Sequence, residues 1–162
     1  MEPGSGLLAT FSELTHARVS VRDFEVREVP VALLDAALLA SSPAPSAGNL
    51  HGYRLFVCHD SNTRAAIGEA AGQGFVARAP IVLVAAADAP RSASKYGRRG
   101  ADLYSLQDAT IFLAHTQLAL TAVGLSSCWV GAFNERMVAS TLGIREAQHL
   151  RPVALLAVTQ LL

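Results

Sequence analysis

One long helical pattern, which leads directly into a strand between Ser105 and Phe133, constrains the fold most. Ser105, with Asp108 three residues later, is typical of a capping box, so the helix is predicted to begin there. Gly124 stands where a left-handed residue would end it. Apolar side chains occupy most faces, as in a helix buried in a core or a subunit interface. Small or polar residues recur along it at helical spacing: Thr110, Ala114, Gln117 and Thr121.

The length favours one domain, residues 1–162, and the composition offers few charged residues for its surface. Hydrophobic residues make up 51% and charged residues 16%, which suggests that a partner subunit or a cofactor covers some apolar surface. The 13 basic and 13 acidic residues balance, so nothing favours nucleic acid or an anionic membrane as a partner. No apolar run approaches the ~18 residues of a membrane span, and the N-terminus lacks a signal pattern. A cytoplasmic protein is therefore predicted.

The reactive side chains exclude several classes of site. Cys58 and Cys128 lie far apart in apolar runs and are predicted to be buried, reduced thiols. The 5 histidines show no close ligand spacing, so no metal site is predicted. The motifs of classical dinucleotide folds, P-loop enzymes and α/β-hydrolases are missing from the sequence. No catalytic acid, base or nucleophile is predicted.

Helical and strand patterns alternate along the rest of the chain. Helices are predicted at 7–16, 28–42, 62–74 and from 134 or 135 to 142, and strands at 53–59, 80–87, 126–133 and 151–160. The continuous apolar run at 80–87 predicts a central strand buried on both faces. This order indicates an α+β or α/β sheet. The polar, basic residues 89–100 are predicted to form a surface loop, or alternatively a mobile active-site cover.

Two stretches carry candidate ligand-binding residues. Arg18, Ser20 and Arg22 alternate with apolar residues, so in an extended chain they project to one side together. Two guanidinium groups and a hydroxyl suit a phosphate, although the exposed face of an edge strand is the alternative. Residues 41–49 are rich in proline and small residues and predict a rigid functional loop. Asn49 could match the polar edge of a ring, or could serve simply as a turn residue.

These stretches, taken together, resemble the nitroreductase-like FMN-dependent oxidoreductase family. The first motif is RVSVRDF at 18–24, and the second is APSAGNLHGYR at 44–54. In the second, His51 and Gly52 replace the family's usual Gln and Pro. The third joins LQDA at 106–109 with GLSSCWVG at 124–131. The resemblance covers nearly the whole chain, in the family's order.

The resemblance implies an α+β fold with a central mixed, mostly antiparallel sheet of about four strands flanked by helices. It places the long helix at the interface of a homodimer, with FMN in a groove between the subunits. The implied activity is hydride transfer from NADH or NADPH, through flavin, to a nitroaromatic, a quinone or a related small acceptor. Two alternatives remain: a flavin-binding or structural dimer with little turnover, and a specialised oxygen-using flavin dehydrogenase.

The motifs also imply which residues bind the cofactor. Arg18, Ser20 and Arg22 would hold the ribityl phosphate, and Asn49 would hydrogen-bond the flavin ring. The loop 45–47 would line the groove from the partner subunit, and residues 130–132 would present backbone groups near the reactive ring nitrogen. The full set is Arg18, Val19, Ser20, Arg22, Pro45, Ser46, Ala47, Asn49, Val130, Gly131 and Ala132.

Two further expectations concern the ends of the site. Family members usually continue past the last strand with a tail that contributes a basic residue to the phosphate. The sequence stops at Leu162, so the resemblance implies that this extension, and one phosphate ligand, are missing. Arg98 and Arg99 are candidates to meet the 2′-phosphate of NADPH, but the sequence does not decide between NADH and NADPH.

Overall fold

The computed structural model describes residues 5–24 and 27–160. The prediction about a missing C-terminal extension concerns the chain from residue 161 onward and lies outside these residues. Four strands form one sheet in the order β1-β2-β4-β3. Their bounds are β1 Tyr53–Cys58, β2 Ile81–Asp88, β3 Leu125–Val130 and β4 Leu150–Gln160. Neighbouring strands pair antiparallel, and one isolated parallel bridge joins Ser20 to Ser127. The predicted α+β fold, with a mostly antiparallel sheet, is confirmed.

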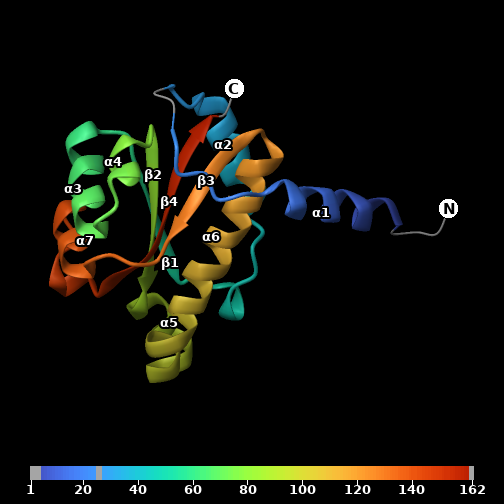
Figure 1. Cartoon of the computed structure of the whole chain (residues 1–162). Coiled ribbons are helices and arrows are strands. Elements are labelled where there is room, and N and C mark those ends of the chain that lie inside the picture. Colours follow the sequence, from blue (N-terminus) through green and yellow to red (C-terminus); the bar gives the residue numbers. More distant parts are fainter. Residues whose placement is uncertain (1–4, 25–26, 161–162) are drawn as a thin grey trace.

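Helices cover both faces of the sheet (Figure 1). One face packs against α3 Ser61–Ala71, α4 Gly74–Arg78 and α7 Glu135–Thr141, and the other against α2 Val31–Ser41 and α6 Ser105–Ala122. The first helix, α1 Ser5–Ala17, projects away from this body (Figure 1). Short 3-10 turns lie at Ala47–Asn49 and Glu146–Gln148. The short α4 was not predicted, because its residues follow a glycine-rich turn.

The core is built on β2, in which every residue is buried. Successive side chains of a strand point to opposite faces. Val82 and Val84 therefore pack with α3, α4 and α7, whereas Leu83 and Ala85 pack with α2 and α6. The predicted central strand, buried on both faces, is confirmed.

The C-terminal end of α6 agrees with the prediction, but its start does not. Gly124 has φ 78° directly after the C-cap, and Leu113 and Leu120 are fully buried against the sheet. The Ser105 hydroxyl, however, donates to the carbonyl of Ala101, because a π-helical turn at Gly100–Tyr104 continues the chain into α6. The predicted capping box is therefore wrong.

The predicted loop at 89–100 is also wrong, since it forms a helix, α5 Ala89–Arg99. Asp88 caps this helix by accepting a hydrogen bond from the Arg91 N–H at 3.1 Å, and Pro90 lies in the first turn. Ser92 is buried, whereas most of the helix is exposed. A polar sequence therefore reflects an exposed helix here, not an irregular chain.

The row of small and polar residues on α6 is not one continuous surface. Thr110 and Ala114 are exposed and Thr121 is half-buried, but Gln117 is buried. Only the exposed part of the row is available to a partner.

The start of α7 provides a test of local stability. The Asn134 side chain accepts a hydrogen bond from the Met137 N–H at 3.1 Å. We expect Asn134→Ala to lower the free energy of unfolding by about 1 kcal/mol, because the helix loses its N-cap. Urea denaturation measures this, with Ser140→Ala, an exposed residue of the same helix, as the control. An unchanged midpoint for Asn134→Ala would contradict the cap.

Candidate functional site

Residues 18–22, the predicted phosphate-binding segment, lie along the edge of the sheet. After α1 the chain runs beside β3, where the Val21 N–H donates to the Ser127 carbonyl at 3.2 Å and Ser20 forms the parallel bridge. Val21 and Phe24 pack into the core on the side of α3 and α7. The segment is thus anchored to the body through its backbone and through its apolar side chains.

The polar side chains of this segment remain available to a ligand. Ser20 and Arg22 are exposed and Arg18 is half-buried. Among the described residues, neither guanidinium has an ion pair or a hydrogen-bond partner. Burial raises the pKa of the Cys128 thiol and the charge of Arg22 opposes this shift, which places Arg22 near β3. Two unpaired cations and a hydroxyl on one short segment fit a phosphate group.

The chain leaves the sheet after Val130. The strand ends at Val130, earlier than predicted, so Gly131 and Ala132 form an exposed connection instead of continuing the strand. A β-carbon at residue 131 would lie 3.7 Å from Trp129 Nε1, an ordinary contact. The described chain does not itself require a glycine there, and the backbone of residues 131 and 132 is exposed.

The loop 44–52 is held by hydrogen bonds from distant elements. The Asp108 carboxylate, on α6, accepts from the N–H groups of Ala47 and Gly52 at 2.9 and 3.1 Å. Asn49 is exposed and has φ 58°, a conformation typical of a turn residue. Both interpretations of Asn49 are therefore compatible: its backbone makes a turn and its side chain is accessible.

The predicted residues form two groups, each attached to a different element. Segment 18–22 and residues 131–132 both adjoin β3, which follows the C-terminal end of α6. The loop 45–49 is bound to Asp108, near the opposite end of that helix. The two groups of predicted residues are thus attached to different elements of the chain, β3 and the first turn of α6.

Sequence reasoning missed Asp108 as a site residue. It is 2% exposed, and its hydrogen-bond partners lie 61 and 56 residues earlier in the chain. The signal was a carboxylate in the first turn of a helix, which also fits a cap. Whether such a carboxylate caps its own helix or binds a distant loop depends on whether another helix precedes the first turn.

The candidates for binding a 2′-phosphate are already partly engaged. Arg98 Nε lies 3.1 Å from Asp102 Oδ2, and Arg99 Nε donates to the Tyr104 hydroxyl at 3.0 Å. Only Nε of each arginine is used in these contacts, so the other N–H groups of both exposed side chains remain available to a phosphate.

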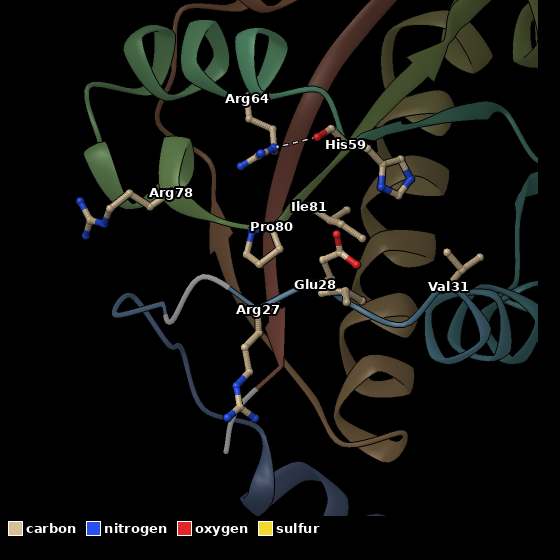
Figure 2. Close-up of a pocket in the computed structure, with 9 residues that line it drawn as sticks. Arg27, Glu28, Val31, His59, Arg64, Arg78, Pro80 and Ile81 are labelled. Carbon is tan, nitrogen blue, oxygen red and sulfur yellow. Dashed lines mark hydrogen bonds between the residues drawn. The ribbon is translucent and has the colours of Figure 1, made fainter.

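A pocket of about 350 Å³ at the start of β2 includes none of the predicted site residues (Figure 2). Its most enclosed arginine, Arg64, donates to the carbonyls of His59, Ala77 and Ala79. These hydrogen bonds connect separate parts of the chain, so Arg64 has a structural role. The Arg27 and Arg78 side chains extend away from one another (Figure 2). The pocket does not offer a converging set of binding groups.

Other site classes find no support within residues 5–24 and 27–160. No three His, Cys, Asp or Glu side chains are grouped there to hold a metal ion. None of the described helices combines the length and the apolar character needed to cross a bilayer. Cys58 and Cys128 are buried, unpaired thiols, as predicted. Burial raises the pKa of Cys58 to about 11, so this thiol stays protonated at neutral pH.

Comparison with known proteins identifies relatives across most of the chain. The model of the nitroreductase family matches residues 16–77 and 69–158. An NADH dehydrogenase of Thermus thermophilus is 30% identical over 155 residues, which cover 78% of this chain and 76% of that protein.

Solved structures agree with the family match. A nitroreductase family protein from Clostridium novyi is 27% identical, with a TM-score of 0.81 over 93% of this chain and 84% of its own. An FMN-dependent nitroreductase from Clostridium difficile is 21% identical, with a TM-score of 0.75 over 88% and 83%, and supports the fold alone. The chain belongs to the nitroreductase family.

Proposed function

We propose that the protein is an FMN-dependent oxidoreductase that uses NADH or NADPH to reduce a nitroaromatic, a quinone or a related small acceptor. One observation carries the proposal: Arg18, Ser20 and Arg22 leave two unpaired guanidinium groups and a hydroxyl beside β3. The names of two relatives support it, one an FMN-dependent nitroreductase and the other an NADH dehydrogenase.

The chain's own contribution is to bind and orient the cofactor. Arg18 and Arg22 would neutralise the phosphate, and Ser20 would add a hydroxyl contact. The open backbone at Gly131 and Ala132 would face the ring, and Asn49 would hydrogen-bond its polar edge. Bound flavin supplies the hydride chemistry itself, so the site needs no acid, base or nucleophile from the protein.

The proposed enzyme is a homodimer. Three apolar side chains of α1 are strongly exposed, with Leu7 at 80%, Leu8 at 69% and Phe11 at 55%. An uncovered apolar helix face marks a site of interaction. A second copy that covers α1 and the exposed part of α6 would also bring a loop 45–49 towards segment 18–22.

The visible spectrum of the purified protein tests the cofactor. We expect flavin absorbance, either as purified or after addition of FMN and removal of the excess. A colourless protein that gains no flavin absorbance refutes the proposal.

Turnover distinguishes the enzyme from a flavin-binding dimer with little activity, which the unusual His51 and Gly52 motivate. FMN-dependent oxidation of NADH or NADPH with a generic quinone supports the oxidoreductase. Flavin binding without turnover favours the inactive dimer. Oxygen consumption without an added acceptor favours an oxygen-using flavin dehydrogenase.

A further inference from the structure

The loop that contains Asn49 has an unusual backbone. Gly48, Asn49 and His51 have φ values of 56°, 58° and 49°. Residues with side chains rarely adopt this left-handed region, and they persist there when surrounding contacts hold them. The contacts that hold this loop therefore decide where the Asn49 side chain lies.

Asp108 supplies two of these contacts, one on each side of the left-handed residues. Its Oδ1 accepts from the Ala47 N–H at 2.9 Å and its Oδ2 accepts from the Gly52 N–H at 3.1 Å. The side chain is buried, and no basic side chain of the described residues forms an ion pair with it. Hydrogen bonds to a buried carboxylate are stronger than neutral ones, so both ends of the loop are held to α6.

Gly52 lies at the centre of this arrangement. Its carbonyl accepts from the Asp88 N–H at 2.9 Å, and Asp88 in turn caps α5. A β-carbon at residue 52 would overlap the Ser92 hydroxyl and lie 3.0 Å from Asp108 Oδ2. Glycine is therefore needed for α5, α6 and the loop to meet this closely.

Capping of its own helix does not explain Asp108. The chain enters α6 from a π-helical turn, and both carboxylate oxygens are directed to the distant loop. We propose that Asp108 is a positioning residue, which holds the strained loop 47–52 in the conformation that presents Asn49 to the flavin ring. The part of this inference that concerns flavin rests on the proposed function.

The test is Asp108→Asn, which keeps the shape of the side chain. An amide oxygen can accept from one N–H, but the NH₂ group must then face the other N–H. We expect about tenfold faster hydrogen exchange at the Ala47 and Gly52 amides of the flavin-free protein, and about tenfold weaker FMN binding. Asp102→Asn removes an exposed carboxylate from the same region and should change neither.

A purely structural role is separated by Asp60→Ala, which removes the N-cap of α3, where the carboxylate accepts from the Thr63 N–H at 2.7 Å, and is expected to lower stability outside the site. If Asp108 only stabilises the fold, both variants should lower the melting temperature and neither should selectively weaken FMN binding. If the Ala47 and Gly52 amides of the wild-type protein are not protected from hydrogen exchange, their hydrogen bonds to Asp108 are refuted without any substitution. Unchanged exchange, or unchanged FMN affinity, in folded Asp108→Asn overturns the positioning role.

The two proposals fail in different ways. If the wild-type protein binds no FMN, the proposed function and the role towards flavin are refuted. Amide exchange still tests whether Asp108 holds the loop 47–52. If the wild-type protein binds FMN and Asp108→Asn binds it equally well, only the positioning role fails.

Discussion

Replacing both Arg18 and Arg22 with alanine is expected to weaken FMN binding by roughly 10²- to 10⁴-fold. A hydrogen bond to a charged group contributes about 1.5–3 kcal/mol, and each 1.4 kcal/mol is about tenfold in affinity. Two lost contacts give the stated range if their effects add. The fold should survive, because the segment is anchored by the backbone of Val21 and by the buried Phe24 side chain. Titration of flavin fluorescence measures the change.

The comparison of FMN with riboflavin makes this prediction specific to the phosphate. The wild-type protein should prefer FMN, and the double variant should bind both flavins about equally. The control is Arg78→Ala with Arg136→Ala, which removes two exposed arginines elsewhere. An equal loss of affinity for riboflavin would show that Arg18 and Arg22 act on another part of the ligand.

Ala114→Arg is expected to convert the proposed dimer into monomers and to lower FMN affinity at the same time. Ala114 is exposed on α6, on the side that the proposed partner covers. In a twofold dimer the substitution acts in both subunits and places an unpaired charge in each. Burying an uncompensated charge costs several kcal/mol, so the dimer should weaken by roughly 100-fold or more. Light scattering gives the mass, and flavin titration gives the affinity.

Ala65→Arg is the matched control for this prediction. Ala65 is an exposed alanine on α3, which covers the opposite face of the sheet. It should leave both mass and affinity unchanged. A dimer of normal mass in Ala114→Arg would show that this part of α6 faces solvent in the assembly.

The elements predicted correctly have signals within their own residues. β2 is a continuous apolar run, α6 ends at a left-handed glycine, and α7 begins after a capping asparagine. Side-chain periodicity and capping depend on neighbours a few positions away, so the sequence contains them directly. The prediction failed at α5, where an exposed helix has the composition of a loop.

The same distinction applies to the site. The alternation of Arg18, Ser20 and Arg22 predicts a phosphate-binding segment. In the structure Ser20 is exposed and neither guanidinium group has a partner among the described residues, so the phosphate role stays a prediction. The role of Asp108 could not be predicted, because its two donors are 61 and 56 residues away. A carboxylate in a first turn is the same local pattern whether it caps a helix or holds a distant loop.

Local sequence patterns specify the family motifs, the central strand and the end of the long helix, because each depends on the chemistry and spacing of nearby residues. Only the tertiary structure decided that segment 18–22 lies on the edge strand, that α5 runs through a π-helical turn into α6, and that loop 47–52 is bound to Asp108. These features depend on which distant segments the packed core brings together. Side-chain periodicity within one segment does not specify those pairings.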